Sequence, residues 1–456
     1  MKDLTQGSIT AHLLRMAGAF QLNMAATTLL SLANIYWLGR LGATAQATVT
    51  LAGIPMMLLL SLMPIISVGS GILIAQAVGA RDRERANGIF NEAFGCSLIV
   101  VAAIGAIVWI GRDTFGAWLS SDPDVAASIA RYVRWLVPSL VVQVPIIVLS
   151  GALDFTGNVR VGVFAQTCMV VLNAVFTPIF VFGWLGAPRL DVEGAAFATF
   201  AAGTLVMTGL VVYSMRGASY LTLAPRTWLA RPVLLKDALK IGLPVGIEGA
   251  VAATYLLVIA MLLRSFGQDQ QAAFGIGQRV FQAVLIPLLA LSNATSVLAG
   301  QNHGAEREDR VRETLRTSLK LGLLAAPLLV VAIEVFAPAI GALLSDDAAV
   351  TAMAATFLRI VAAGLVPLAC AYAVFAVLSG MGNTRSSLYT QIACAALIVT
   401  AAALASRLPG FEPTRLWWIL VAGNALQALL AWQFARRQFG HRPRQPLGAP
   451  ASDAAR

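Results

Sequence analysis

Long apolar segments recur along the whole chain, and short polar segments that hold most of the charged residues separate them. Each apolar segment has roughly the 20 residues that a helix needs to cross the hydrocarbon core of a bilayer. Apolar residues follow one another without the alternation that a membrane β-barrel strand requires. The pattern therefore predicts an all-α membrane protein with about twelve transmembrane helices. The predicted spans cover residues 13–38, 47–78, 91–111, 130–153, 163–185, 193–215, 238–264, 270–300, 317–340, 352–380, 387–406 and 415–435.

An internal repeat gives the strongest evidence on how the chain is organised. The segment AQAVGARDRER at 75–85 matches GQNHGAEREDR at 300–310. The segment GAWLSSDPDV at 116–125 matches GALLSDDAAV at 341–350, and both matches occur at one offset of 225 residues. Agreement at a single offset over so much of the chain indicates a duplication. The sequence therefore predicts two homologous bundles of six helices each.

The predicted N-terminal bundle covers residues 1–215 and the predicted C-terminal bundle covers 238–440. A cytoplasmic linker at 216–237 is expected between them, and a disordered cytoplasmic tail is expected at 441–456. Because six is an even number, both bundles have the same orientation, and their pseudo-two-fold axis is expected along the membrane normal. Two bundles related in this way leave a cleft that opens to either side as they rock, which is typical of a transporter.

Composition supports this fold class and excludes others. Apolar types make up 58% of the 456 residues and charged types only 12%, and the mean hydropathy is +0.77. An average soluble domain is about a quarter charged, so the composition excludes a soluble enzyme, a disordered protein and a nucleic-acid-binding protein. The net charge of +10 is explained by basic loops on the cytoplasmic side of a membrane protein.

The positions of Lys and Arg predict the orientation in the membrane. When residues near a span end are counted with the adjoining loop, 22 of these 32 residues fall on the side that holds both termini and 7 fall on the opposite side, while Arg134, Arg279 and Arg359 are left within spans. Because Lys and Arg accumulate in cytoplasmic loops, both termini are predicted to be cytoplasmic. The expected location is the inner or plasma membrane of the cell.

Neither a metal site nor an active site is evident in the sequence. The four cysteines lie in or beside apolar stretches without a CxxC pair, and the three histidines are scattered. A membrane enzyme would need His, Asp or Glu residues clustered near one membrane face, and a channel would more often show repeated charged rings. We therefore predict a protein that is not an enzyme and that needs no metal and no cofactor.

Glu248 is the ionisable residue with the clearest claim to a function. It lies in KIGLPVGIEGAVAATYLL at 240–257 with apolar residues on both sides, about 12 Å from Lys240 along the helix. Desolvation favours the neutral form of a buried carboxyl group, so such a group is suited to taking up and releasing protons. Glu248 is therefore predicted to couple transport to protons. The alternative is a structural carboxyl group that bonds neighbouring helices.

Arg279 lies in the next predicted span, about 15 Å from Asp269 along the helix. An arginine at that depth needs an acceptor, because its guanidinium group stays charged. One hypothesis pairs it with Glu248, since the two helices are sequential and antiparallel. The alternative is that it binds backbone carbonyl groups at a kink. Asp154, at the end of the fourth span, is interpreted as a helix-end residue rather than a buried one.

Polar and aromatic residues inside the spans are candidates for a substrate cavity. Polar side chains also join helices within membranes, and aromatic or methionine side chains often belong to the core, so both alternatives stay open. The candidates for the cavity are Asn34, Asn173, Thr177, Thr199, Gln278, Gln282, Tyr255, Tyr36 and Met24.

Several motifs together resemble the multidrug and toxic compound extrusion (MATE) transporters of the multidrug/oligosaccharidyl-lipid/polysaccharide exporter superfamily. They are the element GQNHGAERE at 300–308 with its twin AQAVGARDR at 75–83, the segment LPVGIE at the start of the seventh span, and LSGMGNTRSS at 378–387. The resemblance covers the chain up to about residue 440. It implies twelve helices in two lobes, export of bulky organic cations, and coupling to an inward flow of protons or sodium ions.

The chain departs from the family pattern at the ion site of the N-terminal lobe. Where the family usually has an aspartate in the first span, this chain has Asn34. In the fifth span Asn173 is retained, but Thr177 occupies the position of its acidic partner, while Thr199 would match a hydroxyl group of that site. A neutral amide does not exchange protons. Coupling is therefore expected through Glu248, and protons are favoured over sodium because a lone carboxyl group offers a metal ion few ligands.

The sequence thus predicts a secondary transporter that exports amphipathic, often cationic compounds in exchange for protons. Its expected partners are a small organic substrate and membrane lipid, with no nucleic acid, and the chain is expected to act as a monomer. An alternative is a flippase for lipid-linked or polysaccharide precursors, which would need a strongly cationic cavity. A more remote alternative is a membrane protein that transports nothing.

Overall fold

The computed structural model describes residues 3–42, 45–53, 63–216, 219–228, 232–344 and 347–439, and these residues are predominantly helical, with no strand among them. The long helices are α1 (Ile9–Gly39), α3 (Met63–Gly79), α4 (Arg83–Ile110), α6 (Pro123–Phe155), α7 (Val159–Phe182), α8 (Val192–Met215), α9 (Pro232–Leu262), α10 (Gln268–Gly304), α11 (Glu308–Leu344), α12 (Ala348–Ala362), α13 (Leu365–Gly380), α14 (Arg385–Ala405) and α15 (Pro413–Phe439). The short helices are α5 (Arg112–Leu119), η1 (Trp184–Gly186), η2 (Pro225–Thr227) and η3 (Leu263–Phe266).

Polar residues between the apolar segments begin several of these helices. The side chain of Asp82 accepts a hydrogen bond from the Arg85 amide at the start of α4. The carboxylates of Asp122 and Asp347 cap α6 and α12 in the same way. Each cap satisfies backbone N–H groups that have no partner inside the helix. The short polar segments of the sequence therefore mark where these membrane helices start.

The prediction of an all-α membrane protein is confirmed. Among the described residues, nine helices are long and apolar enough to cross a membrane, or ten if α12 and α13, which meet at a bend of 51°, form one span. The predicted span at 47–78 includes residues 54–62, which lie outside the described residues. The predicted tail at 441–456 also lies outside them.

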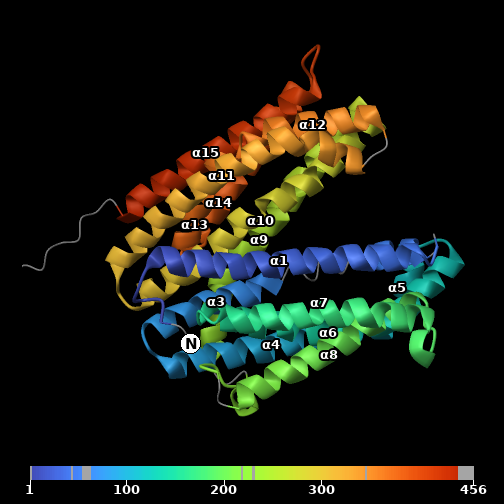
Figure 1. Ribbon diagram of the computed structural model, residues 1–456, viewed down its shortest axis with the longest axis horizontal. Coiled ribbons are helices and arrows are strands. Elements are labelled where there is room, and N and C mark those ends of the chain that lie inside the picture. The colour runs from blue at the N-terminus through green and yellow to red at the C-terminus, as the bar shows by residue number, and fades with distance from the viewer. Residues whose placement is uncertain are drawn as a thin grey trace, which may run out of the picture.

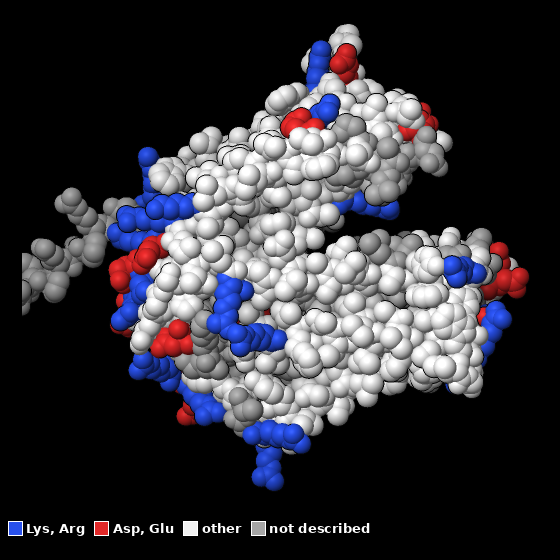
Figure 2. Space-filling model, viewed as in Figure 1, with Lys and Arg blue, Asp and Glu red and all other residues white. Residues whose placement is uncertain are grey.

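The helices gather in two groups, α1 to α8 and α9 to α15, which meet at the end that bears the N-terminus and diverge toward the other end (Figure 1). Figure 2 shows the hollow between the groups at the diverging end and a concentration of Lys and Arg side chains at the opposite end. Each group has its own apolar core. One core is built around Phe90 and Leu149, and the other around Phe357 and Trp417.

Glycines allow the two groups to meet closely, and their contacts follow the repeat. A Cβ atom on Gly79 would lie 1.9 Å from the carbonyl oxygen of Gln301, and a Cβ atom on Gly304 would lie 1.9 Å from that of Gln76. Each pair is the other shifted by the offset of 225 residues. Only glycine permits backbones to approach this closely. We call the end of the molecule that holds this contact between α3 and α10 the closed end.

Two glutamines at the closed end repeat the same symmetry in their hydrogen bonds. The Gln76 side chain donates to the carbonyl oxygen of Gly380 at 2.9 Å. The Gln301 side chain donates to the carbonyl oxygen of Phe155 at 3.0 Å, and it also accepts from the Leu4 amide at 3.3 Å. Both donor bonds join one helix group to the other. The closed end is thus held by a matched pair of polar contacts as well as by packing.

Candidate functional site

A cavity of about 650 Å³ lies between the two helix groups. Helices α1, α3, α6 and α7 contribute to it from one group, and α9, α10, α13, α14 and α15 contribute from the other. Apolar residues such as Phe20, Ile147 and Phe375 cover part of its wall. The polar lining residues are Asn23, Ser67, Ser150, Asp154, Gln166, Glu248, Ser292, Asn293, Ser296, Tyr372, Ser379, Ser387, Gln391 and Gln427.

Repeat-related residues face this cavity from both groups. Gln166 and Gln391 are separated by the offset of 225 residues, and both line the cavity. The two carboxyl groups break the symmetry, because Glu248 corresponds to Asn23 and Asp154 corresponds to Ser379. Each helix group therefore supplies one acidic side chain from a different position of the repeat.

Glu248 lies inside a membrane helix, as the sequence predicted, and its side chain is half-buried. It projects from α9, which packs against α3 and α14. The Ser387 hydroxyl of α14 lies 2.5 Å from the Glu248 carboxyl oxygen Oε1 and 2.9 Å from the carbonyl oxygen of Thr384. The carboxyl group is thus held at the cavity wall by a hydroxyl group of the same helix group.

Asp154 was interpreted as a helix-end residue rather than a buried one, and in the structure it is both near the end of α6 and buried. Its residue exposure is 7%, and it lines the cavity. The interpretation was wrong because the end of α6 lies at the closed end, where Phe155 accepts the bond from Gln301, and not at a water-exposed loop. Among the described residues, the Asp154 carboxyl group forms no hydrogen bond or ion pair. A Cβ atom on Gly162 would lie 2.6 Å from its oxygen Oδ1, so Gly162 leaves the carboxyl group its space.

The repeat contained a signal for Asp154. The segments LDFTGNVR at 153–160 and LSGMGNTR at 378–385 correspond, and Asp154 stands where the second copy has a serine. An acidic residue at one copy of a repeated helix end is unexpected if the position only ends a helix. Burial of that end, however, depends on contact between the two groups, which local sequence patterns do not reveal.

The predicted pair of Glu248 and Arg279 is not formed. Arg279 is exposed and is not among the residues lining the cavity. Glu248 shares the cavity with residues of α10 from Leu289 to Ser296, at least ten residues beyond Arg279, which is about 15 Å along the helix. The hypothesis was wrong because it assumed that consecutive helices pack side by side at equal depth.

Three of the other candidates form a structural network instead of a cavity wall. The Asn173 side chain of α7 donates to the Thr199 hydroxyl of α8 at 2.8 Å, and the Thr177 hydroxyl donates to Asn173 Oδ1 at 3.1 Å. Asn173 and Thr177 are fully buried. None of the three lines the cavity. Of the two readings that the sequence left open, the structure supports their role in joining helices.

The remaining candidates differ in whether they line the cavity, pack in a core or lie on the surface. Met24 lines the cavity. Tyr255 packs against the core of the second helix group. Tyr36 is exposed and stacks with Arg40, whose guanidinium carbon lies 4.7 Å from the ring centre. Asn34 and Gln278 are half-buried, Gln282 is exposed, and none of these three is among the residues that line the cavity.

We predict that Asn173→Ala lowers thermal stability without removing function. The change leaves the hydroxyl groups of Thr177 and Thr199 without their shared partner, and hydrogen bonds between membrane helices contribute about 1 kcal/mol. A fall in the melting temperature of the purified protein, with unchanged ligand binding, is expected. Thr204→Ala is the control, because its exposed hydroxyl bonds only its own helix, at Phe200. Equal stability of the two variants would show that the network contributes nothing.

The comparison with known families identifies one matching family. The MatE family model matches residues 20–179 and 244–404, one segment in each half of the chain. Among characterised relatives, a FAD transporter of Shewanella oneidensis is 25% identical over 418 residues, which cover 89% of this chain and 90% of the relative. The multidrug export protein MepA of Staphylococcus aureus is 23% identical over 422 residues, which cover 90% and 91%.

Solved structures show the same fold. A crystal structure of MATE in complex with MaL6 matches with a TM-score of 0.87 at 22% identity, covering 96% of this chain and 97% of the other. A structure described as the outward-facing conformation of a multidrug resistance MATE family transporter matches with a TM-score of 0.86 over the same shares. The predicted architecture of two six-helix halves is thereby confirmed.

Proposed function

Since the chain belongs to the MatE family of multidrug efflux transporters, we propose that it exports amphipathic organic cations in exchange for protons. In this proposal the cavity between the two helix groups holds the substrate, and Glu248 carries the proton. The chain is a multi-pass membrane transporter and not an enzyme. We propose the substrate class and the coupling ion in addition to the membership of the family.

The charge of the cavity is the observation that carries the proposal. Asp154 and Glu248 line it, and no Lys or Arg is among its described lining residues. In a medium of low dielectric constant, carboxyl groups favour a cation and oppose an anion. Apolar and aromatic residues in the same wall suit the hydrophobic part of an amphipathic molecule. Substrate and proton would then compete for the same acidic groups, which is the basis of an exchange.

Ser387 gives a second reason to assign protons to Glu248. Its hydroxyl group has one hydrogen and two acceptors within reach, the Glu248 carboxyl group and the Thr384 carbonyl oxygen. A protonated Glu248 would donate to Ser387 while Ser387 donates to Thr384, so each hydrogen would have a place. A sodium ion would need several oxygen ligands. The Glu248 contacts supply one serine hydroxyl in addition to the carboxyl group, which favours the proton.

The cavity does not favour the alternative of a flippase for pyrophosphate-linked precursors. Such a substrate is anionic and would need basic residues where this cavity presents two acids. The relative from Shewanella oneidensis is named a FAD transporter, and FAD also contains a pyrophosphate group. We therefore expect this chain to bind an organic cation in preference to FAD.

Transport in proteoliposomes tests the proposed substrate class. Tetraphenylphosphonium serves as the cationic probe and FAD as the anionic one, each with an imposed pH gradient. We expect gradient-dependent movement of tetraphenylphosphonium and little movement of FAD. Movement of FAD without movement of the cation would contradict the proposal.

We predict that Asp154→Asn weakens binding of tetraphenylphosphonium about tenfold, since removal of one nearby charge in a partly desolvated site costs about 1–2 kcal/mol. The substitution keeps the size of the side chain. Ser379→Ala, at the equivalent position of the other group, is the control and should bind the probe as the unmodified protein does. Unchanged affinity in Asp154→Asn would remove this residue from the substrate site.

A further inference from the structure

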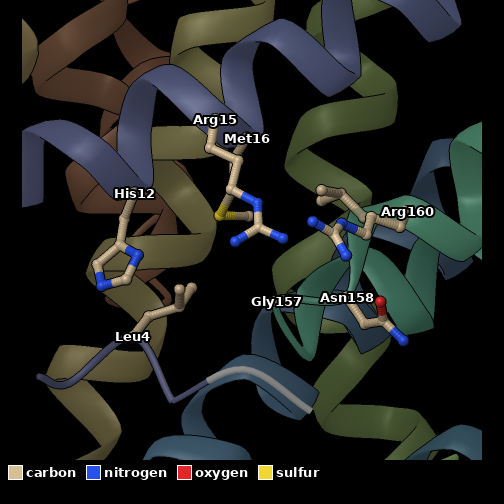
Figure 3. Close-up of a pocket in the computed structure, with 8 residues that line it drawn as sticks. Leu4, His12, Arg15, Met16, Gly157, Asn158 and Arg160 are labelled. Carbon is tan, nitrogen blue, oxygen red and sulfur yellow. The ribbon is translucent and has the colours of Figure 1, made fainter. Parts of the chain in front are cut away.

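A small basic pocket lies away from the cavity, near the closed end. It has a volume of about 150 Å³ and is formed by the start of α1 and the turn before α7. Figure 3 shows the guanidinium groups of Arg15 and Arg160 pointing toward one another across it. His12 lies at its edge and shares a hydrogen bond of 2.8 Å with the Gln6 carbonyl oxygen. We call this space the basic pocket.

The two arginines lack an anionic neighbour. The residues that line the basic pocket include no Asp or Glu, and within the described ranges neither Arg15 nor Arg160 forms an ion pair or a side-chain hydrogen bond. Other arginines of this end are satisfied, since Arg310 donates to Gly7 and Arg83 donates to Tyr220. Both arginines are exposed, so water screens part of their mutual repulsion, and an anion placed between them would be attracted by both. Planar guanidinium groups in this arrangement suit a phosphate group.

The backbone adds to the positive potential of the basic pocket. Helix α7 begins at Val159, and its N-cap residue Asn158 makes no side-chain capping bond. The N–H groups of the first turn therefore present the positive end of the helix dipole beside Arg160. Together with the two arginines, this end of α7 forms a site for a single negative group.

An apolar groove continues from the same arginine. Arg160 stands at one end of a space of about 450 Å³ between α7 and α8. Phe164, Leu172 and Leu205 line that groove, and Phe164 and Leu205 are largely exposed. A phosphate site joined to an apolar groove between membrane helices matches a phospholipid, with its headgroup at the arginines and an acyl chain in the groove. A free phosphate ion would leave the groove without an occupant.

We propose that Arg15 and Arg160 bind the phosphate of an anionic phospholipid, and that one acyl chain of this lipid occupies the groove between α7 and α8. The lipid would join α1 to α7 close to the N-terminal segment that bonds to Gln301. By ordering the start of α1, it would also support the N-terminal segment, whose Leu4 amide bonds Gln301 of the other helix group. This inference concerns the lipid environment and is independent of the proposed substrate and coupling ion.

Lipid retention measures the proposal directly. The full-length protein is reconstituted in nanodiscs with equal amounts of phosphatidylglycerol and phosphatidylcholine, and the lipids retained after release are counted by native mass spectrometry. We expect phosphatidylglycerol to be enriched at least about fivefold, consistent with the attraction of two arginines for an anionic headgroup. Arg15→Gln combined with Arg160→Gln should remove this enrichment. Arg85→Gln combined with Arg316→Gln, which removes the same charge from other exposed sites, should preserve it.

Two further measurements test the lipid site even if the double variant folds poorly. Gly209→Leu should fill the groove, since a Cβ atom at Gly209 meets no other atom within 4 Å, and it should reduce retention of phosphatidylglycerol. Equal enrichment in Gly209→Leu would contradict occupation of the groove. Inorganic phosphate added to the detergent-solubilised protein should stabilise it much less than phosphatidylglycerol does. Equal stabilisation would identify a plain anion site and overturn the lipid assignment.

Discussion

Glu248→Gln is expected to reduce transport driven by a pH gradient by at least about tenfold while the protein still folds and still binds tetraphenylphosphonium. The amide of glutamine keeps the size of the side chain and remains able to bond Ser387, so the packing of α9 against α14 should survive. It does not take up or release a proton near neutral pH. The imposed pH gradient would then have no group through which to act.

The measurement compares initial rates in proteoliposomes with and without the gradient. Asn23→Asp offers a useful companion, because Asn23 is the residue of the first helix group that corresponds to Glu248 and also lines the cavity. It adds a carboxyl group without disturbing the original one and should keep gradient-driven transport. If Glu248→Gln responds to the gradient as the unmodified protein does, Glu248 is not the proton carrier.

Gly79→Val combined with Gly304→Val is expected to prevent the closed end from forming. A Cβ atom at either position would lie 1.9 Å from a backbone carbonyl oxygen of the other helix group. Backbone atoms of packed helices cannot relieve such a clash by a change of rotamer, as a side chain could. Overpacking of this kind costs about 1–3 kcal/mol at each site, and even 1 kcal/mol shifts a conformational equilibrium about fivefold. Transport should fall by at least about tenfold, since the cycle would lose one of its states.

Spin-label distances across the closed end test this expectation. Labels at the exposed positions Glu84 of α4 and Glu313 of α11 should move apart in the double variant. Gly275→Val is the matched control, because Gly275 lies on α10 as Gly304 does, yet a Cβ atom there meets nothing within 4 Å. Unchanged distances with normal transport in the double variant would show that the close glycine contacts are not required.

Much of the fold was predictable because a membrane helix is recognised by the length of its apolar segment, which is a local property of the sequence. The repeat offset of 225 residues predicted two homologous bundles, and the equivalent bonds of Gln76 and Gln301 in the structure follow the same offset. These features depend on neighbouring residues or on internal similarity, and both are present in a single sequence.

The site was less predictable, because it depends on which helices meet. Glu248 was found by the cost of placing a carboxyl group among apolar residues. Asp154 was missed since its burial arises from contact between the helix groups. The pair with Arg279 failed because α9 and α10 present different depths to the cavity. Lateral packing of this kind is set by the whole molecule, and no spacing in the sequence reports it.

Proton release on binding tests whether cation and proton compete within one acidic cavity. Tetraphenylphosphonium is added to the purified protein in weakly buffered solution near neutral pH, and the change in pH is recorded. We expect the unmodified protein to release protons on binding and Glu248→Gln, at equal occupancy by the probe, to release markedly fewer. Equal release by both proteins, or binding without any release, would contradict this expectation.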